Sequence, residues 1–286
     1  MKNRNVLLSV VVSGSILGGG LALGRSACTP QPEPQPPPPP PTVTVDAPPP
    51  ELKCEFVGPK IRGMKRRQTR IVGGEPALSG SFPFAAALAT DSRFQYCGGS
   101  VVADRFILTA AHCQVGAGDL ALVGSTDLTK ARAVRISESR INPKFVPATL
   151  DFDVAVAKLE ASAGVPTVSL AATATSKDAT VIGWGATSEG GSTTTLLRQV
   201  SVPLWDWEKC RGIYPSLTSR QLCAGESGVD SCQGDSGSSL LTPSTSWQQL
   251  GIVSYGIGCA RPGIPGVYSD LRAPELSTWV AACIRE

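Results

Sequence analysis

The stretch "CGGSVVADRFILTAAHC", residues 97–113, contains two short apolar runs, "GSVVAD" and "RFILTAA". Both runs are rich in apolar and β-branched residues and too short for helices, so each predicts a β-strand. Similar runs recur along the chain: "VAVAKL" at 154–159, "ATVIGWG" at 179–185, "QLGIVSYG" at 249–256 and "GVYSDL" at 266–271. Short strands separated by Gly, Ser, Thr and Pro are typical of a barrel or a sandwich, so the sequence predicts an all-β fold.

The C-terminal stretch "PELSTWVAACIRE", residues 274–286, follows a different pattern. Its apolar residues recur at helical spacing: Leu276, Trp279, Val280, Cys283 and Ile284. These positions correspond to i, i+3, i+4, i+7 and i+8, which share one face of a helix. We therefore expect an amphipathic helix to close the chain.

The residues before position 71 predict export and processing. Basic residues precede the apolar stretch "VLLSVVVSGSILGGGLAL", which is typical of a secretory signal over residues 1–24. Residues 28–50 contain half of the chain's 24 prolines and predict an extended spacer. Residues 51–70 are basic and end in "KRRQTR" directly before "IVGG". This arrangement favours a prosegment that is cut from the domain at 71–286.

The charge distribution argues against nucleic-acid binding. The formal net charge is +3, but residues 1–70 carry 10 Lys and Arg against 4 Asp and Glu, whereas residues 71–286 carry 16 against 19. The main body is therefore mildly acidic and lacks a basic nucleic-acid footprint. His112 is the only histidine and no Cys-x-x-Cys pair occurs, so we expect neither a metal site nor a cofactor.

Nucleophilic catalysis is the chemistry that the polar motifs support. A serine hydroxyl needs a base to take its proton and a third group to orient that base. His112 is the one candidate base, and "GDSG" at 234–237 presents Ser236. An α/β-hydrolase would need Gly-x-Ser-x-Gly with its histidine after the serine. Here "GDSGS" ends in Ser238 and the histidine precedes the serine, so that reading fails.

Four motifs occur together in one order: "CGGSVVADRFILTAAHC", "DFDVAVAKL", "DSCQGDSG" and "IVSYGIGCARPGIPGVY". With them, residues 71–286 resemble the trypsin-like serine proteases of the chymotrypsin fold. The resemblance implies two six-stranded antiparallel β-barrels packed together, followed by the C-terminal α-helix.

The resemblance also implies a role for each catalytic residue. His112 matches the general base, Asp153 the buried acid that holds its tautomer, and Ser236 the nucleophile. The backbone N–H groups of Gly234 and Ser236 match the oxyanion hole. Asp151 lies two residues before Asp153, and we interpret it as a solvated loop acid.

A substrate pocket for basic side chains follows from the same resemblance. Asp230 matches the floor of the primary pocket, where a poorly solvated carboxylate would pair with Arg or Lys. The other residues that match the substrate-binding site are Ser231, Ser254, Gly256 and Gly266.

An activation switch is implied as well. Asp235 matches the residue that pairs with a newly freed N-terminus, here the α-amino group of Ile71 after cleavage behind Arg70. Removing one partner of a buried ion pair costs about 3–5 kcal/mol. Withholding the amine would therefore leave the site unformed, which predicts a zymogen.

The nine cysteines predict an oxidising compartment. The resemblance supplies three disulfides: Cys97–Cys113, Cys210–Cys223 and Cys232–Cys259. Cys28, Cys54 and Cys283 remain. In one interpretation the signal is cleaved after residue 27 and Cys28 is lipidated. Cys54 would then pair with Cys283, and this bond would tether the prosegment to the protease domain. The other cleaves the signal after Gly24 and leaves Cys28 on a secreted protein, and Cys283 would also fit as a small core residue.

The sequence thus predicts a secreted or cell-surface serine endopeptidase, made as a zymogen and acting as a monomer. Its expected partners are protein or peptide substrates with Arg or Lys and proteinaceous inhibitors, with membrane anchoring if Cys28 is lipidated. The alternative is a catalytically silent trypsin-like binding protein. Ser238 and Ser239 stand where the family has Gly-Pro, and we expect this departure to tune the local backbone without abolishing activity.

Overall fold

The computed structural model describes Cys54 and residues 74–185, 193–226, 228, 234–258 and 261–285. The described residues belong to one compact unit, residues 50–286. Several predictions fall outside the described residues: the signal peptide, the proline-rich spacer, the prosegment apart from Cys54, Cys28, Arg70, Ile71, Asp230, Ser231, Cys232 and Cys259. Within the described ranges, no helix combines the length and the apolar character needed to cross a membrane.

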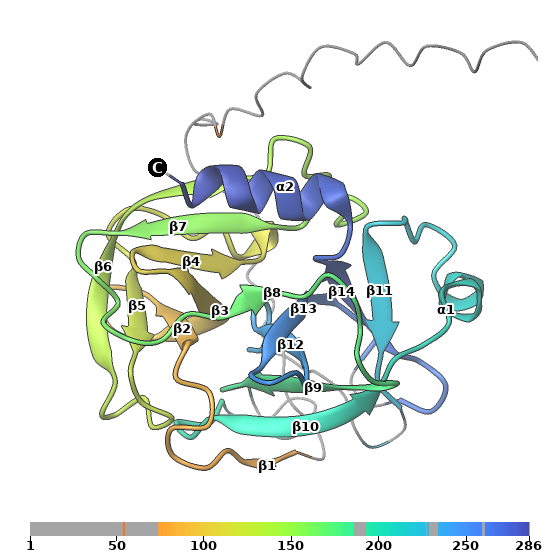
Figure 1. Ribbon diagram of the computed structural model, residues 1–286, viewed down its shortest axis with the longest axis horizontal. Helices are drawn as coiled ribbons and strands as arrows, with labels where there is room; N and C mark the ends of the chain where they lie inside the picture. The colour runs from red at the N-terminus through yellow and green to blue at the C-terminus, as the bar shows by residue number, and fades with distance from the viewer. Residues whose placement is uncertain are drawn as a thin grey trace, which may run out of the picture. The chain divides into compact units, whose positions relative to one another are not determined.

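The first barrel is a closed sheet of six antiparallel strands in the order β2–β3–β4–β7–β6–β5 (Figure 1). Its strands are β2 (Ala85–Ala89), β3 (Gln95–Ala103), β4 (Phe106–Thr109), β5 (Leu120–Val123), β6 (Arg132–Ile141) and β7 (Ala155–Leu159). The two apolar runs in residues 97–113 fall in β3 and β4, which pair with each other, and β4 also pairs with β7.

The second sheet contains β1 (Glu75–Pro76), β8 (Ser169–Leu170), β9 (Asp178–Gly183), β10 (Arg198–Pro203), β11 (Gln221–Ala224), β12 (Ser239–Thr242), β13 (Gln248–Tyr255) and β14 (Gly266–Asp270). Six of these strands follow the order β10–β9–β12–β13–β14–β11, and an isolated bridge between Leu204 and Ala224 brings β11 back to the end of β10. The short strands β1 and β8 are additions that the sequence did not predict. The all-β fold with two barrel-like sheets is confirmed.

Helices occupy little of the described chain. The expected closing helix is α2 (Pro274–Cys283), whose buried face contains Leu276, Trp279, Val280 and Cys283. It lies beside β7 of the first barrel (Figure 1). A shorter helix, α1 (Trp207–Ile213), begins at Asp206, whose carboxylate caps the N–H groups of Glu208 and Lys209. This helix was not predicted from the sequence.

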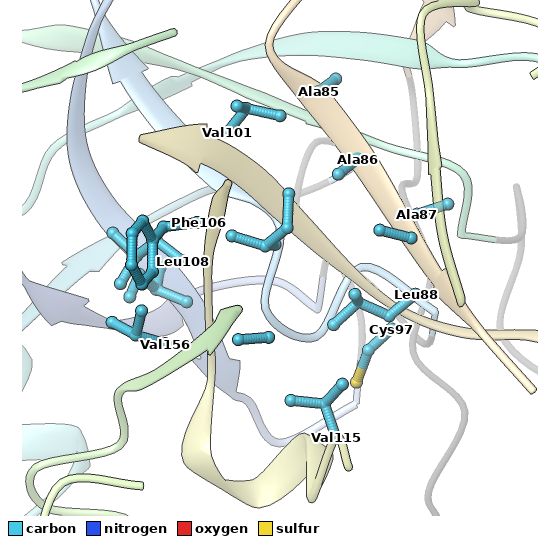
Figure 2. Close-up of a cluster of buried hydrophobic side chains, with 14 of the residues drawn as sticks. Ala85, Ala86, Ala87, Leu88, Cys97, Val101, Phe106, Leu108, Val115 and Val156 are labelled. Carbon is cyan, nitrogen blue, oxygen red and sulfur yellow. The ribbon is translucent and has the colours of Figure 1, made fainter. Parts of the chain in front are cut away.

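Small side chains fill part of the first barrel. All five residues of β2 are buried, and four of them are alanines. Figure 2 shows Ala85, Ala86, Ala87 and Leu88 in one apolar cluster with Val101. Alanine favours helices in isolation, but β2 pairs with both β3 and β5, so tertiary pairing overrides that preference.

Three disulfides join described cysteines: Cys97–Cys113, Cys210–Cys223 and Cys54–Cys283. The first bond ties β3 to the short 3₁₀ turn at Ala111–Cys113, which directly follows β4. The third bond joins Cys54 to the last residue of α2, and both of its cysteines are buried. Cys283 is therefore not a free core thiol.

Candidate active site

His112 and Asp153 meet at the edge of the first barrel. His112 lies in the 3₁₀ turn after β4, and Asp153 lies two residues before β7, the strand that pairs with β4. The Nδ1–H of His112 donates to Asp153 Oδ2 at 2.7 Å, and the backbone N–H of His112 donates to Oδ1 at 2.8 Å. Because a carboxylate only accepts, this contact holds the ring proton on Nδ1 and leaves Nε2 to act as a base.

Two serines of the second sheet hold Asp153 in addition to its contacts with His112. The hydroxyl of Ser254, on β13, donates to Asp153 Oδ2 at 2.5 Å, and the hydroxyl of Ser269, on β14, donates to its backbone carbonyl at 2.8 Å. The Asp153 side chain is fully buried, whereas the His112 side chain remains 19% exposed. The acid is therefore locked between the two sheets, while the base stays accessible.

The pKa of His112 is raised above its ordinary value of 6.5. Burial by itself lowers this pKa, since it disfavours the charged imidazolium. The negative charge of Asp153 and its hydrogen bond to the ring act in the opposite direction and together outweigh burial. The pair therefore stabilises the imidazolium that forms when the base accepts a proton.

The turn that contains Ser236 packs against the segment before His112. The N–H of Gly98 donates to the carbonyl of Ser236 at 2.8 Å. Gly237 has a φ of +81°, and a Cβ at this position would lie 2.6 Å from the carbonyl oxygen of Gly98 and 3.2 Å from the backbone nitrogen of Ala110. A glycine is therefore required here by both conformation and space. Ser236 itself is buried next to this contact.

Asp235 is fully buried in a cradle formed by two glycines. The N–H of Gly185 donates to its Oδ1 at 2.9 Å. A Cβ on Gly183 or Gly185 would come within 3.0 Å or 2.6 Å of the Asp235 carboxyl carbon. The absence of both side chains thus makes room for the carboxylate. Ile71, its expected partner, lies outside the described residues.

Gln95 contacts the same turn and was missed by sequence reasoning. Its side-chain amide donates to the carbonyl of Gly234 at 3.0 Å and to the carbonyl of Cys97 at 3.1 Å. The residue is 8% exposed, and its Oε1 has no hydrogen-bond partner among the described residues. A buried amide held in this way fixes the orientation of the Gly234 carbonyl, directly beside a predicted oxyanion donor.

The expected pocket walls lie close together. A Cβ built on Gly256 would be 3.8 Å from the Cα of Gly266, so side chains at either position would fill the space between them. Ser254, the third described residue of this set, is buried and occupied by its contact with Asp153. Asp230 and Ser231 lie outside the described residues.

Ser238, the first of the two unusual serines after the Ser236 turn, fits against Gly98. A Cβ on Gly98 would collide with the hydroxyl of Ser238, so Gly98 provides the space for that side chain. The described non-glycine residues with positive φ are Arg93, Gln114, Leu150 and Phe152. Ser238 is not among them, so its position does not demand a glycine backbone.

The interpretation of Asp151 as a solvated acid is wrong. Its side chain is only 11% exposed, and its carboxylate accepts two hydrogen bonds from the guanidinium of Arg220 and one from the hydroxyl of Thr218. Nothing in the sequence indicated this contact, because Arg220 lies 69 residues from Asp151 along the chain.

Comparisons with known proteins agree with this geometry. The trypsin family model matches residues 71–280. The chain is 38% identical to a trypsin of Saccharopolyspora erythraea over 216 aligned residues. This alignment covers 71% of this chain and 94% of that protein. It is 36% identical over 225 residues to trypsin-1 of Astacus astacus, and the alignment covers 70% of this chain and 95% of that protein. The solved structure of mouse neuropsin, a serine protease, aligns with a TM-score of 0.68 and 29% identity, covering 75% of this chain and 100% of that chain.

Proposed function

Because this chain belongs to the trypsin family of serine proteases, we propose that it is an active serine endopeptidase. The observation that carries the proposal is the His112–Asp153 pair, joined at 2.7 Å with the acid fully buried, beside the glycine-built turn of Ser236. In this proposal His112 is the general base, Asp153 orients it, and Ser236 is the nucleophile.

The chemistry follows from the proton positions. Ser236 Oγ attacks the scissile carbonyl as its proton passes to His112 Nε2. This nitrogen is basic because the contact with Asp153 keeps the ring proton on Nδ1. The N–H groups of Gly234 and Ser236 stabilise the oxyanion, and one such donor contributes about 3–4 kcal/mol to the barrier. His112 then protonates the leaving amine, and a water molecule hydrolyses the acyl-enzyme by the same steps.

Cleavage after Arg or Lys is the proposed specificity. Asp230 would lie at the pocket floor, with Ser231 beside it, and the facing glycines Gly256 and Gly266 would leave room for a long basic side chain. A buried carboxylate is stabilised by a guanidinium or ammonium group, so basic residues would be selected over apolar ones.

Activation by cleavage between Arg70 and Ile71 is the proposed control. The glycine cradle around Asp235 holds a buried carboxylate, and the new α-amino group of Ile71 would be its charge partner. Export to an oxidising compartment accords with the disulfides. Because Cys54 is bonded to Cys283, the segment before Arg70 would stay attached after the cut.

The first experiment uses the purified chain without residues 1–28, treated with a trace of trypsin. We expect a new N-terminus at Ile71 and hydrolysis of Arg and Lys amide substrates but not of a Phe amide. Covalent labelling of Ser236 by a fluorophosphonate should accompany activity. Correct cleavage at Ile71 without hydrolysis or labelling would overturn the proposal in favour of a silent binding protein.

The raised pKa of His112 predicts a pH dependence. Catalysis needs the neutral imidazole, so kcat/KM should fall as the pH drops through the pKa of the free enzyme. Because the Asp153 contact raises that pKa, the midpoint of the acid limb should lie above 6.5. A kcat/KM profile on an Arg amide substrate measures it, and a midpoint below 6.5 would contradict the assigned pair.

Gln95→Leu tests the contact to the oxyanion turn. Leucine keeps the volume but removes the donor to the Gly234 carbonyl, and losing a buried hydrogen bond costs about 1–3 kcal/mol. We expect kcat to fall about tenfold with little change in KM. Gln199→Leu is the matched control, because Gln199 on β10 donates to Glu75 far from the turn in sequence. Equal kcat values for both variants would assign Gln95 a purely structural role.

A further inference from the structure

Asp151, Thr218 and Arg220 form a polar contact that we name the interbarrel clamp. Arg220 donates through Nε to Asp151 Oδ1 at 3.0 Å and through Nη2 to Oδ2 at 2.7 Å. Thr218 Oγ1 donates to the same Oδ1 at 2.9 Å. Asp151 precedes β7 of the first barrel, whereas Arg220 directly precedes β11 of the second sheet. The clamp therefore joins the two sheets by a two-pronged ion pair.

The clamp is largely withdrawn from solvent. The side chains of Asp151 and Arg220 are 11% and 19% exposed. Burial raises the pKa of Asp151, but the hydrogen bonds from Arg220 and Thr218 and the charge of Arg220 outweigh it and lower that pKa. The carboxylate is thus held ionised.

The backbone around Asp151 is in an unfavourable conformation. Leu150 and Phe152, its two neighbours, both have a φ of +53°, a region that side chains other than glycine rarely adopt. The same segment of the second sheet restrains them, since Gln221 Nε2 donates to the carbonyl of Leu150 at 3.1 Å. The guanidinium of Arg220 lies 4.5 Å from the centre of the Phe152 ring. Such a backbone persists only where its surroundings enforce it.

This enforced backbone leads directly into Asp153. The carbonyl of Phe152 accepts from the N–H of Val154 at 2.8 Å, which makes a three-residue turn centred on Asp153. The backbone conformation of Phe152 therefore determines how the backbone of Asp153 is oriented, and with it the direction of the Asp153 side chain. Any relaxation of Phe152 would move the Asp153 carboxylate relative to His112.

We propose that the interbarrel clamp is a positioning device that keeps Asp153 aligned with His112 by holding the strained Leu150–Phe152 loop against the second sheet. The inference rests on the proposed catalytic function. It assigns Asp151 and Arg220 a role in kcat through the position of Asp153.

Other ionisable groups surround the clamp and bear on its pH dependence. Glu275 of α2 lies 3.7 Å from Arg220, and Lys144 lies 5.5 Å from the centre of the Phe152 ring. Tyr255 of β13 has its pKa raised to about 12, chiefly by burial, then by Tyr214, with smaller contributions from Asp151 and Asp153. Tyr255 stays neutral through the acid limb, where histidine is the side chain that ordinarily changes charge.

The test compares Arg220→Gln and Arg220→Lys with Arg272→Gln. Arg272 is a matched control, because it makes the same two-pronged contact to Asp270, with distances of 2.8 and 2.7 Å. Each activated variant is titrated with a fluorophosphonate, so that kcat refers to competent sites. Arg220→Lys keeps the charge but not the fork, which guards against a variant that fails to fold.

We expect Arg220→Gln to lower kcat by about ten- to a hundredfold, as small misplacements of catalytic groups do, with KM nearly unchanged. The acid limb of kcat/KM should move to lower pH, because a displaced Asp153 raises the pKa of His112 less. Arg220→Lys should fall between the wild type and Arg220→Gln, while Arg272→Gln should change thermal stability alone.

The clamp proposal is overturned if Arg220→Gln shifts kcat and the acid limb no more than Arg272→Gln does. That result is distinct from failure of the proposed function itself. If the catalytic assignment is wrong, the activated wild-type protein will neither hydrolyse Arg amides nor react with the fluorophosphonate.

Discussion

Ser236→Ala should reduce kcat of the activated protease by about 10⁶-fold, the size of effect that follows loss of the nucleophile in serine proteases. Alanine leaves the Gly98 contact to the Ser236 carbonyl and the two N–H groups proposed for the oxyanion hole in place, since these are backbone groups. Substrate binding should therefore persist while acyl transfer stops. Initial rates on an Arg amide and fluorophosphonate labelling, which should disappear, measure the effect.

Ser239→Ala is the control for this experiment. Ser239 lies three residues later, is fully buried, and its hydroxyl has no partner among the described residues. Removing such a hydroxyl should leave activity and labelling intact. If Ser236→Ala kept most of the activity, another residue would have to be the nucleophile.

Asp153→Asn should lower kcat by about 10⁴-fold at neutral pH, because the amide cannot accept all the hydrogen bonds that its neighbours donate to the carboxylate. Oδ2 accepts from both the His112 ring and Ser254, and Oδ1 accepts from the backbone N–H of His112. An NH₂ group at the Oδ2 position would face two donors. His112 would then move its proton to Nε2 and cease to be a base.

Turning the amide over does not rescue this variant, because the NH₂ group would then face the backbone N–H of His112. A kcat/KM profile across pH should show a loss far beyond that of Ser254→Ala, which removes one donor to Asp153 and preserves the carboxylate. Comparable losses in the two variants would show that the charge on Asp153 is not what holds the histidine.

The main architecture was predictable because its signals are local. The runs in β3, β4, β7, β9, β13 and β14 are short and apolar, and α2 has its buried residues at helical spacing. Strand β2 was not predicted, because a run of alanines has no β-propensity of its own and becomes a strand only through pairing on both sides. Helix α1 depends on the Asp206 cap more than on an apolar face.

The site was predictable to a different extent. His112, Asp153 and Ser236 belong to recognisable motifs, and the structure joins the first two directly. Gln95 and Arg220 make long-range contacts, to Gly234 and Asp151, which leave no periodic or compositional trace in the sequence. Residues that support a site from a distance in sequence become visible only once the chain is folded.

The bond between Cys54 and Cys283 makes the intervening chain a covalent ring, with a sequence separation of 229 residues. In the chain-entropy description, closing a ring of this size restricts the unfolded state enough to favour folding by about 5 kcal/mol. A cut after Arg70 opens the ring without dividing the molecule, so this restriction vanishes. Activation would then exchange an entropic constraint on the unfolded chain for an electrostatic contact at Asp235, and the active form would rely on that new contact for its stability.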